Sequence, residues 1–161
     1  MKRILTFFAL ALLLTNCTRE EVVEVQDNYF EALSFEIELD FNAANNYEFI
    51  EPYGFEVLPS DVTLVYILWE DNPGTADDIW RLVPQTIIFD TGDDLVYNFD
   101  FTQVDVRFFL EGSDLDGLDS VWTQNQVFRV VVVPAFNTGR VDYSDINTVM
   151  ELYNIESFPR R

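Results

Sequence analysis

The sequence predicts a mainly β fold, an antiparallel β-sandwich with one C-terminal α-helix, preceded by a signal peptide. Three observations predict it: apolar residues alternate with polar ones from residue 33 onward, loops rich in Asp, Asn and Gly separate these runs, and one later segment shows helical spacing. The chain has 161 residues, a length typical of one folded domain behind a leader. We expect a signal peptide at residues 1–16, a lipidated acidic tether at 17–31 and the β-sandwich domain at 32–161.

The N-terminus has the pattern of a lipoprotein signal. Basic residues at positions 2 and 3 precede an apolar run, 4–14, which is short of the roughly 20 residues that a spanning helix needs. Residues 14–17, Leu-Thr-Asn-Cys, resemble a lipobox, in which the cysteine is lipidated and becomes the mature N-terminus. We therefore expect lipidation at Cys17, the only cysteine, and an outer membrane lipoprotein on the periplasmic or cell-surface face. The alternative is an ordinary secretory signal with an incidental cysteine.

The segment after Cys17 is acidic and lacks sustained alternation, which predicts a short tether at residues 18–31. Its start, Arg19-Glu20-Glu21, resembles the acidic export signals that direct some lipoproteins of the Bacteroidota to the cell surface. A solvated spacer explains the same residues, and the sequence leaves both interpretations open.

The charge of the chain is strongly negative. Two of its nine basic residues precede Cys17, so the mature part carries seven arginines against 29 acidic residues, a net charge of −22, and it has no lysine or histidine. Such a field repels nucleic acid and anionic lipid surfaces and attracts cations and basic partners. Because 48% of the residues are hydrophobic and 16% are aromatic, we expect a folded chain and not a disordered one.

The first strands follow from apolar alternation. At residues 33–41 every second residue is apolar, which predicts a strand with one buried face and one face toward water. Residues 62–69 are apolar on both faces, which predicts a central strand covered on both sides. Residues 80–89 contain Pro84, which cannot donate to a ladder, so this segment is an edge strand, a bulge or two short strands.

Further strands bring the expected number to six to eight. Residues 95–101 and 104–110 alternate, residues 126–133 are rich in β-branched side chains, and shorter strands are expected at 47–50 and 53–57. Strands at this spacing favour an immunoglobulin-like architecture. A helix is expected at 144–153, capped by Ser144 and packed over one face or end of the sheets.

The available side chains exclude most catalytic chemistry. Without histidine there is no Ser-His-Asp triad and no imidazole metal ligand, and without lysine in the mature part there is no Schiff base or P-loop. Once Cys17 is lipidated, no thiol nucleophile or cysteine metal site remains. Hydrolysis by paired carboxylates stays open, but pairs arise by chance in so acidic a chain. We expect a protein that is not an enzyme.

One loop has features of a calcium site. Asp114, Asp116 and Asp119 lie around Gly117, and carboxylates at such spacing can converge on Ca²⁺, although the match to an EF-hand loop is poor. The acidic pairs at 77–78 and 93–94 would join them if the loops cluster at one end of the molecule. The alternative, which we favour, is a solvated acidic turn.

Aromatic residues offer a second kind of site. An exposed tryptophan can stack on sugars, and Trp122 is the best candidate because it lies at a junction of loop and strand, whereas Trp69 and Trp80 are expected to pack in the core. Core packing explains all three equally well. Three arginines stand on strands among acidic residues and are expected to form ion pairs: Arg81, Arg107 and Arg129.

A family resemblance lies in five segments of the chain, which are 40–47, 60–69, 78–89, 95–112 and 122–134. These segments resemble a family of small uncharacterised lipoproteins from flavobacteria and other Bacteroidota. Some relatives in that family carry a collagen-like tract before the domain, which this chain replaces with the acidic tether. The resemblance implies an envelope location and a single domain, and it brings no functional residues with it.

These observations favour a non-catalytic, membrane-anchored envelope lipoprotein with an interaction or structural role and an unknown protein or glycan partner. The alternative is a β-sandwich module that binds glycan or calcium.

Overall fold

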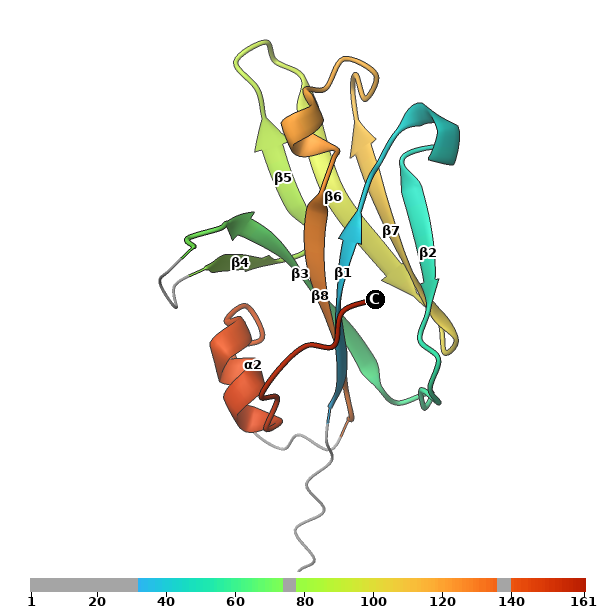
Figure 1. The fold of residues 1–161 in the computed structure, drawn as a ribbon, viewed down its shortest axis with the longest axis vertical. Coiled ribbons are helices and arrows are strands. Elements are labelled where there is room, and N and C mark those ends of the chain that lie inside the picture. Colours follow the sequence, from blue (N-terminus) through green and yellow to red (C-terminus); the bar gives the residue numbers. More distant parts are fainter. Residues whose placement is uncertain (1–31, 74–77, 136–139) are drawn as a thin grey trace, which may run out of the picture.

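The computed structural model describes residues 32–73, 78–135 and 140–161. Within these residues the chain is mainly β, with two antiparallel four-stranded sheets and one C-terminal helix (Figure 1). The predicted signal peptide, the lipidation site Cys17 and the tether lie outside the described residues.

The first sheet has β8 and β3 at its centre, and β3 is the longest strand among the described residues. Its order is β1-β8-β3-β4, formed by β1 (Leu33–Leu39), β8 (Gln126–Val133), β3 (Val62–Glu70) and β4 (Ile79–Leu82). All neighbouring strands pair antiparallel, and a bulge shifts the register of β3 and β4 between Leu68 and Glu70.

The second sheet has the order β2-β7-β6-β5, again with antiparallel neighbours. Its strands are β2 (Glu48–Pro52), β7 (Asp105–Gly112), β6 (Asp94–Phe101) and β5 (Gln85–Ile88). The chain passes from the first sheet to the second at Pro84, so the predicted segment 80–89 is two short strands, each at an edge of its own sheet. Proline lacks the N–H that a continuous ladder would need there.

The predicted strand at 53–57 is wrong. Gly54 adopts a φ of 72°, in the left-handed region, which breaks the extended backbone after β2 ends at Pro52. Tyr53 is instead completely buried, and its hydroxyl shares a 2.7 Å hydrogen bond with the buried hydroxyl of Thr63. The neighbouring prediction, a short strand at 47–50, corresponds to β2.

One hydrophobic core receives side chains from both sheets. Phe128 of β8 lies near its centre, and its ring contacts Phe108 of β7, Tyr97 of β6 and Phe41, with centroids 5.0 to 6.4 Å apart. Complete burial of one such side chain contributes about 2–3 kcal/mol. The members of this core alternate along the strands, as the sequence predicts for β1, β6 and β7.

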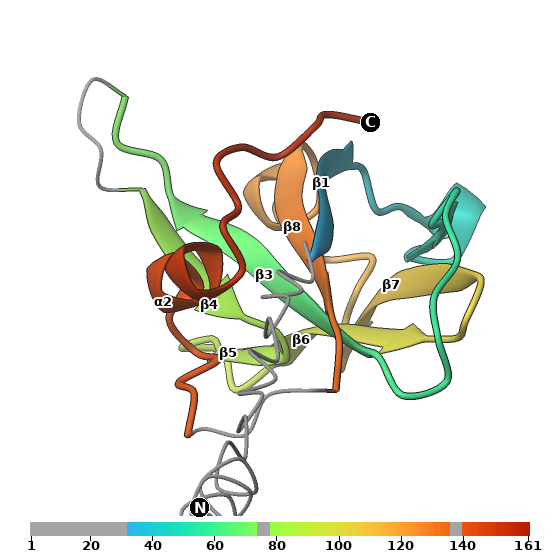
Figure 2. The ribbon, with the colours of Figure 1, turned by 90° about the horizontal axis from the view of Figure 1, so that it is seen from below.

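The helix α2 (Ile146–Leu152) covers the other face of the first sheet (Figures 1 and 2). Ile146 and Val149 pack there against Leu64 and Tyr66 of β3 in a second cluster of buried residues. The prediction that β3 is covered on both sides is therefore confirmed.

The N-cap of α2 is Asp145 and not Ser144. The Asp145 carboxylate accepts hydrogen bonds from the Asn147 N–H at 3.0 Å and the Thr148 hydroxyl at 2.8 Å. Ser144 bonds to a residue that precedes the helix: both its N–H and its hydroxyl donate to the Asp142 carboxylate. Asp and Ser are about equally good N-cap residues, so the sequence alone does not distinguish them. The helix begins at Ile146, and this makes Asp145 the cap.

The alternation at 33–41 predicts that the outer face of β1 is exposed to water along its whole length, but the structure differs at Glu36. Glu36 is only 8% exposed, because Arg129 on the neighbouring strand and Arg160 both donate to its carboxylate, at 3.1 and 2.9 Å. Residues 159–161 run along the edge of β1, where the Glu36 N–H donates to the Pro159 carbonyl and the Arg161 N–H to the Glu36 carbonyl. The tail thereby covers an edge that would otherwise offer free hydrogen-bonding groups.

Candidate functional site

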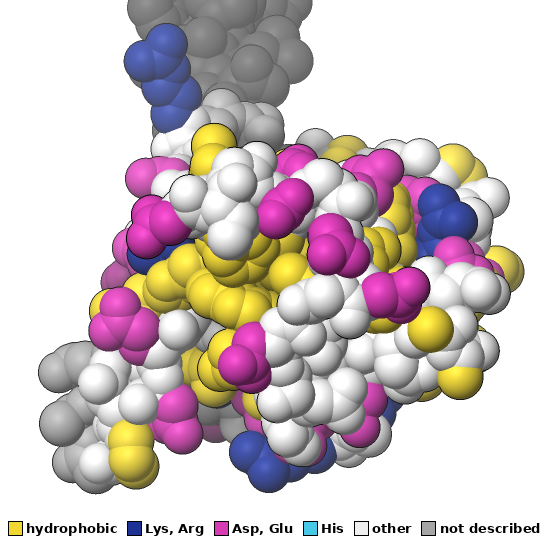
Figure 3. All heavy atoms as spheres, turned by 90° about the horizontal axis from the view of Figure 1, so that it is seen from above, with side chains coloured by type: hydrophobic (Ala, Val, Ile, Leu, Met, Phe, Trp, Pro, Cys, Tyr) yellow, Lys and Arg dark blue, Asp and Glu magenta, His cyan; other side chains and the backbone are white. Residues whose placement is uncertain are grey.

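An apolar furrow lies at one end of the molecule, where β3 and β7 end and β6 and β8 begin. Figure 3 shows hydrophobic side chains gathered in a hollow on this end, with acidic side chains along both rims. Two hollows, of about 330 and 380 Å³, open here, and Trp122 lines both of them. We therefore define the furrow as these two hollows with Trp122 between them.

Trp122 belongs to the short 3-10 helix η3 (Ser120–Trp122), which the loop between β7 and β8 forms. Asp119 caps this helix by accepting the Val121 N–H at 3.1 Å. The Trp122 indole is partly buried: it contacts Trp69 with ring centroids 6.4 Å apart and Phe89 with centroids 5.6 Å apart. The three tryptophans are all partly buried, and Trp69 and Trp122 pack on the core that the sheets share.

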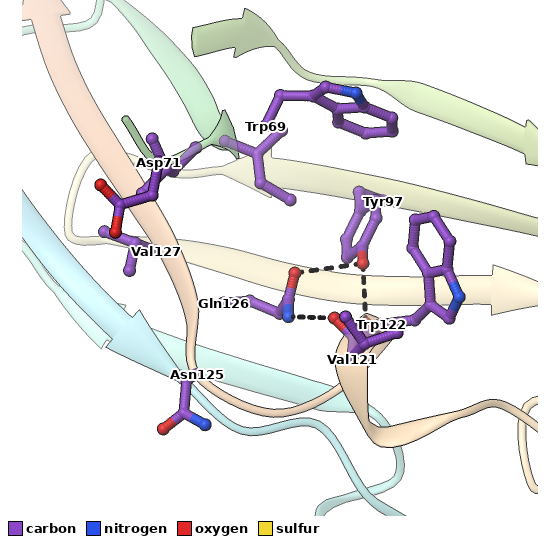
Figure 4. A pocket seen from close by; sticks show the side chains of 10 residues that line it. Trp69, Asp71, Tyr97, Val121, Trp122, Asn125, Gln126 and Val127 are labelled. Atoms are coloured by element: carbon purple, nitrogen blue, oxygen red, sulfur yellow. Dashed lines mark hydrogen bonds between the residues drawn. The ribbon is translucent and has the colours of Figure 1, made fainter. Parts of the chain in front are cut away.

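Tyr97 forms the floor of the first hollow, between the indoles of Trp69 and Trp122 (Figure 4). Its single hydroxyl hydrogen is shared between the Trp122 carbonyl, at 2.7 Å, and Gln126 Oε1, at 3.1 Å. Burial raises the pKa of this hydroxyl above its usual value, so it stays a neutral donor.

Gln126 fixes the position of η3 over this floor. Its Nε2 group donates to the carbonyls of Val121 at 3.0 Å and Gln124 at 2.7 Å, so both amide hydrogens are used within the protein (Figure 4). The amide oxygen then faces the Tyr97 hydroxyl. Asp71, at the rim, brings a carboxylate to the same hollow.

The second hollow is more acidic. Its lining combines Phe89 and Leu118 with the three carboxylates of Asp93, Asp114 and Asp119. The loops that carry Asp93 and Asp114 are joined through Ser113, whose hydroxyl and N–H donate to Asp93 and Asp94. The loops at 93–94 and 113–119 therefore lie together, while Asp78 accepts the Asn72 N–H at 3.0 Å and does not line either hollow, and residue 77 lies outside the described residues.

The three aspartates predicted as calcium ligands turn toward different partners. Asp114 accepts the Gly117 N–H at 3.1 Å, and a Cβ at Gly117 would lie 2.3 Å from the Asp114 carboxylate, which explains the glycine. Asp116 accepts the Tyr47 hydroxyl at 2.6 Å, and Asp119 caps η3. Among the described residues, no group of three or more acidic side chains is arranged to hold a metal ion.

Tyr47 is in a backbone conformation that is rare for a bulky residue, with φ at 55°. Its N–H donates to the Asn42 carbonyl and its own carbonyl accepts from Leu110, which hold it there. The hydrogen bond to Asp116 raises the pKa of the Tyr47 hydroxyl. This contact fixes the loop after β1 to the acidic loop of the furrow.

The predicted ion pairs are confirmed for two arginines. Arg107 pairs with Asp100 and Glu48, and Arg129 pairs with Glu36. For Arg81 the contact in the structure is with Trp69, whose ring centroid lies 3.9 Å from the guanidinium carbon.

Sequence reasoning singled out Trp122, the aspartates Asp114 and Asp119 and the acidic pair at 93–94, but it did not identify Tyr97, Phe89 or Gln126 as residues of a site. Tyr97 stands at an inward position of a predicted strand, and Phe89 and Gln126 lie at strand ends. Nothing local distinguishes them from core residues, because their meeting depends on which strand ends come together.

Comparisons with known protein families, with curated proteins and with solved structures each find no match. Within the described residues, no helix is both long enough and apolar enough to cross a membrane.

Proposed function

We propose that this chain is a non-catalytic interaction module, anchored to the cell envelope through lipid on Cys17. In this proposal the two sheets form a β-sandwich of immunoglobulin-like architecture, and the furrow at its end binds a partner. The tether, residues 17–31, holds the domain away from the membrane. The membrane in this proposal is the outer membrane, as the resemblance to flavobacterial lipoproteins implies. The lipobox-like residues 14–17 support the anchor.

The observation that carries the binding role is the position of Trp122. A partly exposed indole between two hollows offers a large apolar surface to a ligand at low conformational cost, as aromatic anchors do at protein interfaces. Tyr97 donates to the Trp122 carbonyl, and Gln126 and Asp119 bond to the backbone of the preceding Val121, so the surface is already formed before a ligand binds.

The composition supports a role without catalysis. The chain has no histidine, and the described residues have no lysine or cysteine, so imidazole, amine and thiol groups are missing from the furrow and carboxylates are its main ionisable groups. Asp114 and Asp119, which line the second hollow, already accept backbone hydrogen bonds.

A glycan-binding module is the second candidate. Trp122 and Trp69 stand side by side at the furrow, and carboxylates at its rim can accept hydrogen bonds from sugar hydroxyls.

The anchor is tested by labelling cells that produce the full chain with radioactive palmitate. We expect label in the wild-type protein and none in Cys17→Ala, which should also leave the membrane fraction. Equal labelling of the two would contradict the proposal.

The binding role is tested with a photo-crosslinking amino acid at Val121, beside the furrow. Val104 is a matched control, since both side chains are 67% exposed and Val104 lies in the turn between β6 and β7 at the opposite end (Figure 1). We expect a discrete adduct on intact cells from position 121 and not from 104. Equal patterns from both positions would argue against a binding end.

A further inference from the structure

We propose that the furrow binds a basic polypeptide segment, with an Arg or Lys side chain against Trp122 and the rim carboxylates. This inference rests on the binding role proposed above and specifies its partner. The argument comes from how the protein binds its own arginines.

Three arginines of this chain each contact an aromatic ring and a carboxylate at the same time. Arg129 lies 3.9 Å from the Trp80 ring centroid and pairs with Glu36. Arg161 lies 3.9 Å from the Phe35 ring centroid and pairs with Glu51.

Arg107 repeats the arrangement on the outer face of the second sheet. Its guanidinium carbon lies 4.7 Å from the Phe109 ring centroid, and it pairs with Asp100 at 2.6 Å. Cation–π attraction and charge-assisted hydrogen bonds act on the same group in all three places.

The furrow presents the same two components. Trp122 supplies the ring, and four carboxylates line the two hollows beside it: Asp71, Asp93, Asp114 and Asp119. No basic side chain is among the described residues that line either hollow. The combination that elsewhere holds an arginine of this chain is therefore open to an arginine from a partner.

The carboxylates of the furrow favour a cationic donor. They only accept, and the Gln126 amide hydrogens and the Tyr97 hydroxyl hydrogen are used within the protein. A guanidinium has five donors and no acceptor, so it matches these carboxylates, whereas a sugar would have to use the other donors of the lining, Thr91, Asn125 and the two indole N–H groups.

The neighbouring Trp69 shows that an aromatic face at this end accepts a cation, because Arg81 lies over it. The formal charge of the whole chain, −20, adds a long-range field that draws basic segments and repels nucleic acid and anionic lipid. We therefore expect association that weakens as salt screens this field.

The test uses the full chain in neutral detergent and three short amidated peptides. One has two arginines flanking a leucine, and in the others glutamine or glutamate replaces the arginines. Affinity is measured by calorimetry at about 0.02 M and about 0.3 M NaCl, since the screening length differs several-fold between these. A panel of neutral oligosaccharides is measured in parallel.

Two furrow variants and one control separate the contributions. Trp122→Leu keeps apolar bulk but removes the ring face, and we expect about tenfold weaker binding of the arginine peptide. Asp71→Asn with Asp119→Asn should weaken it about threefold to tenfold at low salt, with the η3 cap retained because Asn also caps. The control, Glu56→Gln with Glu151→Gln, makes the same charge change at exposed sites and should bind like wild type.

The outcomes distinguish this inference from the binding role itself. The inference is supported if the arginine peptide binds selectively, if its binding weakens with salt, and if both furrow variants weaken that binding. Equal binding of the glutamine peptide, or Trp122-dependent binding of an oligosaccharide alone, would overturn the basic partner and leave the binding role standing. If the control variant loses as much affinity for the arginine peptide as the furrow variant with two aspartates replaced, binding depends on the net charge of the chain and not on the carboxylates of the furrow. That result would also overturn the inference.

Discussion

Tyr97 and Trp122 join the core to the furrow: the buried Tyr97 hydroxyl donates to the Trp122 carbonyl at 2.7 Å. Tyr97 is held rigidly because its ring packs on Phe128 at the centre of the core. The position of Trp122 is thus set by a residue of the second sheet. We expect changes in core packing around Tyr97 to displace Trp122 at the furrow.

Tyr97→Phe should therefore lower stability and loosen the furrow. The Trp122 carbonyl and Gln126 Oε1 would lose their donor in a partly buried place, at a cost of about 1–3 kcal/mol. Urea unfolding measures the loss. Tyr47→Phe is the matched control: its hydroxyl bonds to the exposed Asp116, so its unfolding free energy should stay within about 0.5 kcal/mol of wild type. Equal effects of the two changes would contradict the role given to Tyr97.

Glu36→Gln should be among the most destabilising changes of a single carboxylate. The side chain is 10% exposed and accepts from two arginines, while Arg129 is itself only 22% exposed and would be left without its charged acceptor. We expect a loss of about 2 kcal/mol in unfolding free energy. Glu38→Gln, an exposed neighbour on the same strand, should change little.

The contrast with Arg160 sharpens this test. Arg160 is 85% exposed, so its pair with Glu36 is screened by water, and Arg160→Ala should cost much less than Glu36→Gln. If Glu36→Gln and Glu38→Gln unfold at the same urea concentration, the buried ion pair contributes nothing to stability.

Glu36 also shows where sequence reasoning ends. Alternation at 33–41 correctly predicts that Phe35, Ile37 and Leu39 face the core, because the pleat has a period of two, but Leu33 at the start of β1 is exposed. It cannot show that Glu36 is opposite Arg129, because that register depends on a partner 93 residues away. Nor can it show that Arg160 covers the same carboxylate from the other side.

The rest of the fold divides in the same way. The run 126–133 predicts β8 with its bounds, and two apolar faces predict that β3 is covered, since these signals are local. The furrow was predicted only in its parts. The sequence identifies Trp122 and the acidic loop as candidate residues. Phe89 and Tyr97 join them only because the ends of several strands, including β5, come together, and no local pattern contains this information.

Stability should fall in alkaline solution. Burial raises the pKa values of Tyr66 and Tyr97 in the folded protein above the usual value of about 10. The unfolded chain thus releases these protons first, so the contribution to stability is complete below about pH 10 and is lost as pH rises toward the folded pKa values. The urea midpoint should be level to about pH 9.5 and then decrease.

Absorbance near 295 nm checks the cause, since the described residues contain no lysine, histidine or cysteine, and only tyrosine titrates in this range. The tyrosines should ionise in an early and a late group, and the double variant Tyr66→Phe with Tyr97→Phe should lose part of the late group. A midpoint that stays level beyond pH 11, or a titration in a single step, would contradict the shifts.

Calcium should raise the melting temperature no more than magnesium does. Asp114, Asp116 and Asp119 accept from the Gly117 N–H, the Tyr47 hydroxyl and the Val121 N–H of η3, so turning all three onto one ion would disturb contacts that already stabilise the fold. Any divalent cation screens the net charge of −20, and that effect should be equal for the two metals at matched ionic strength. The measurement is thermal melting of the full chain with millimolar calcium, magnesium or additional NaCl. A calcium-specific rise of several degrees that Asp114→Asn removes would mean linked binding to the folded state, and the acidic loop would then be a metal site after all.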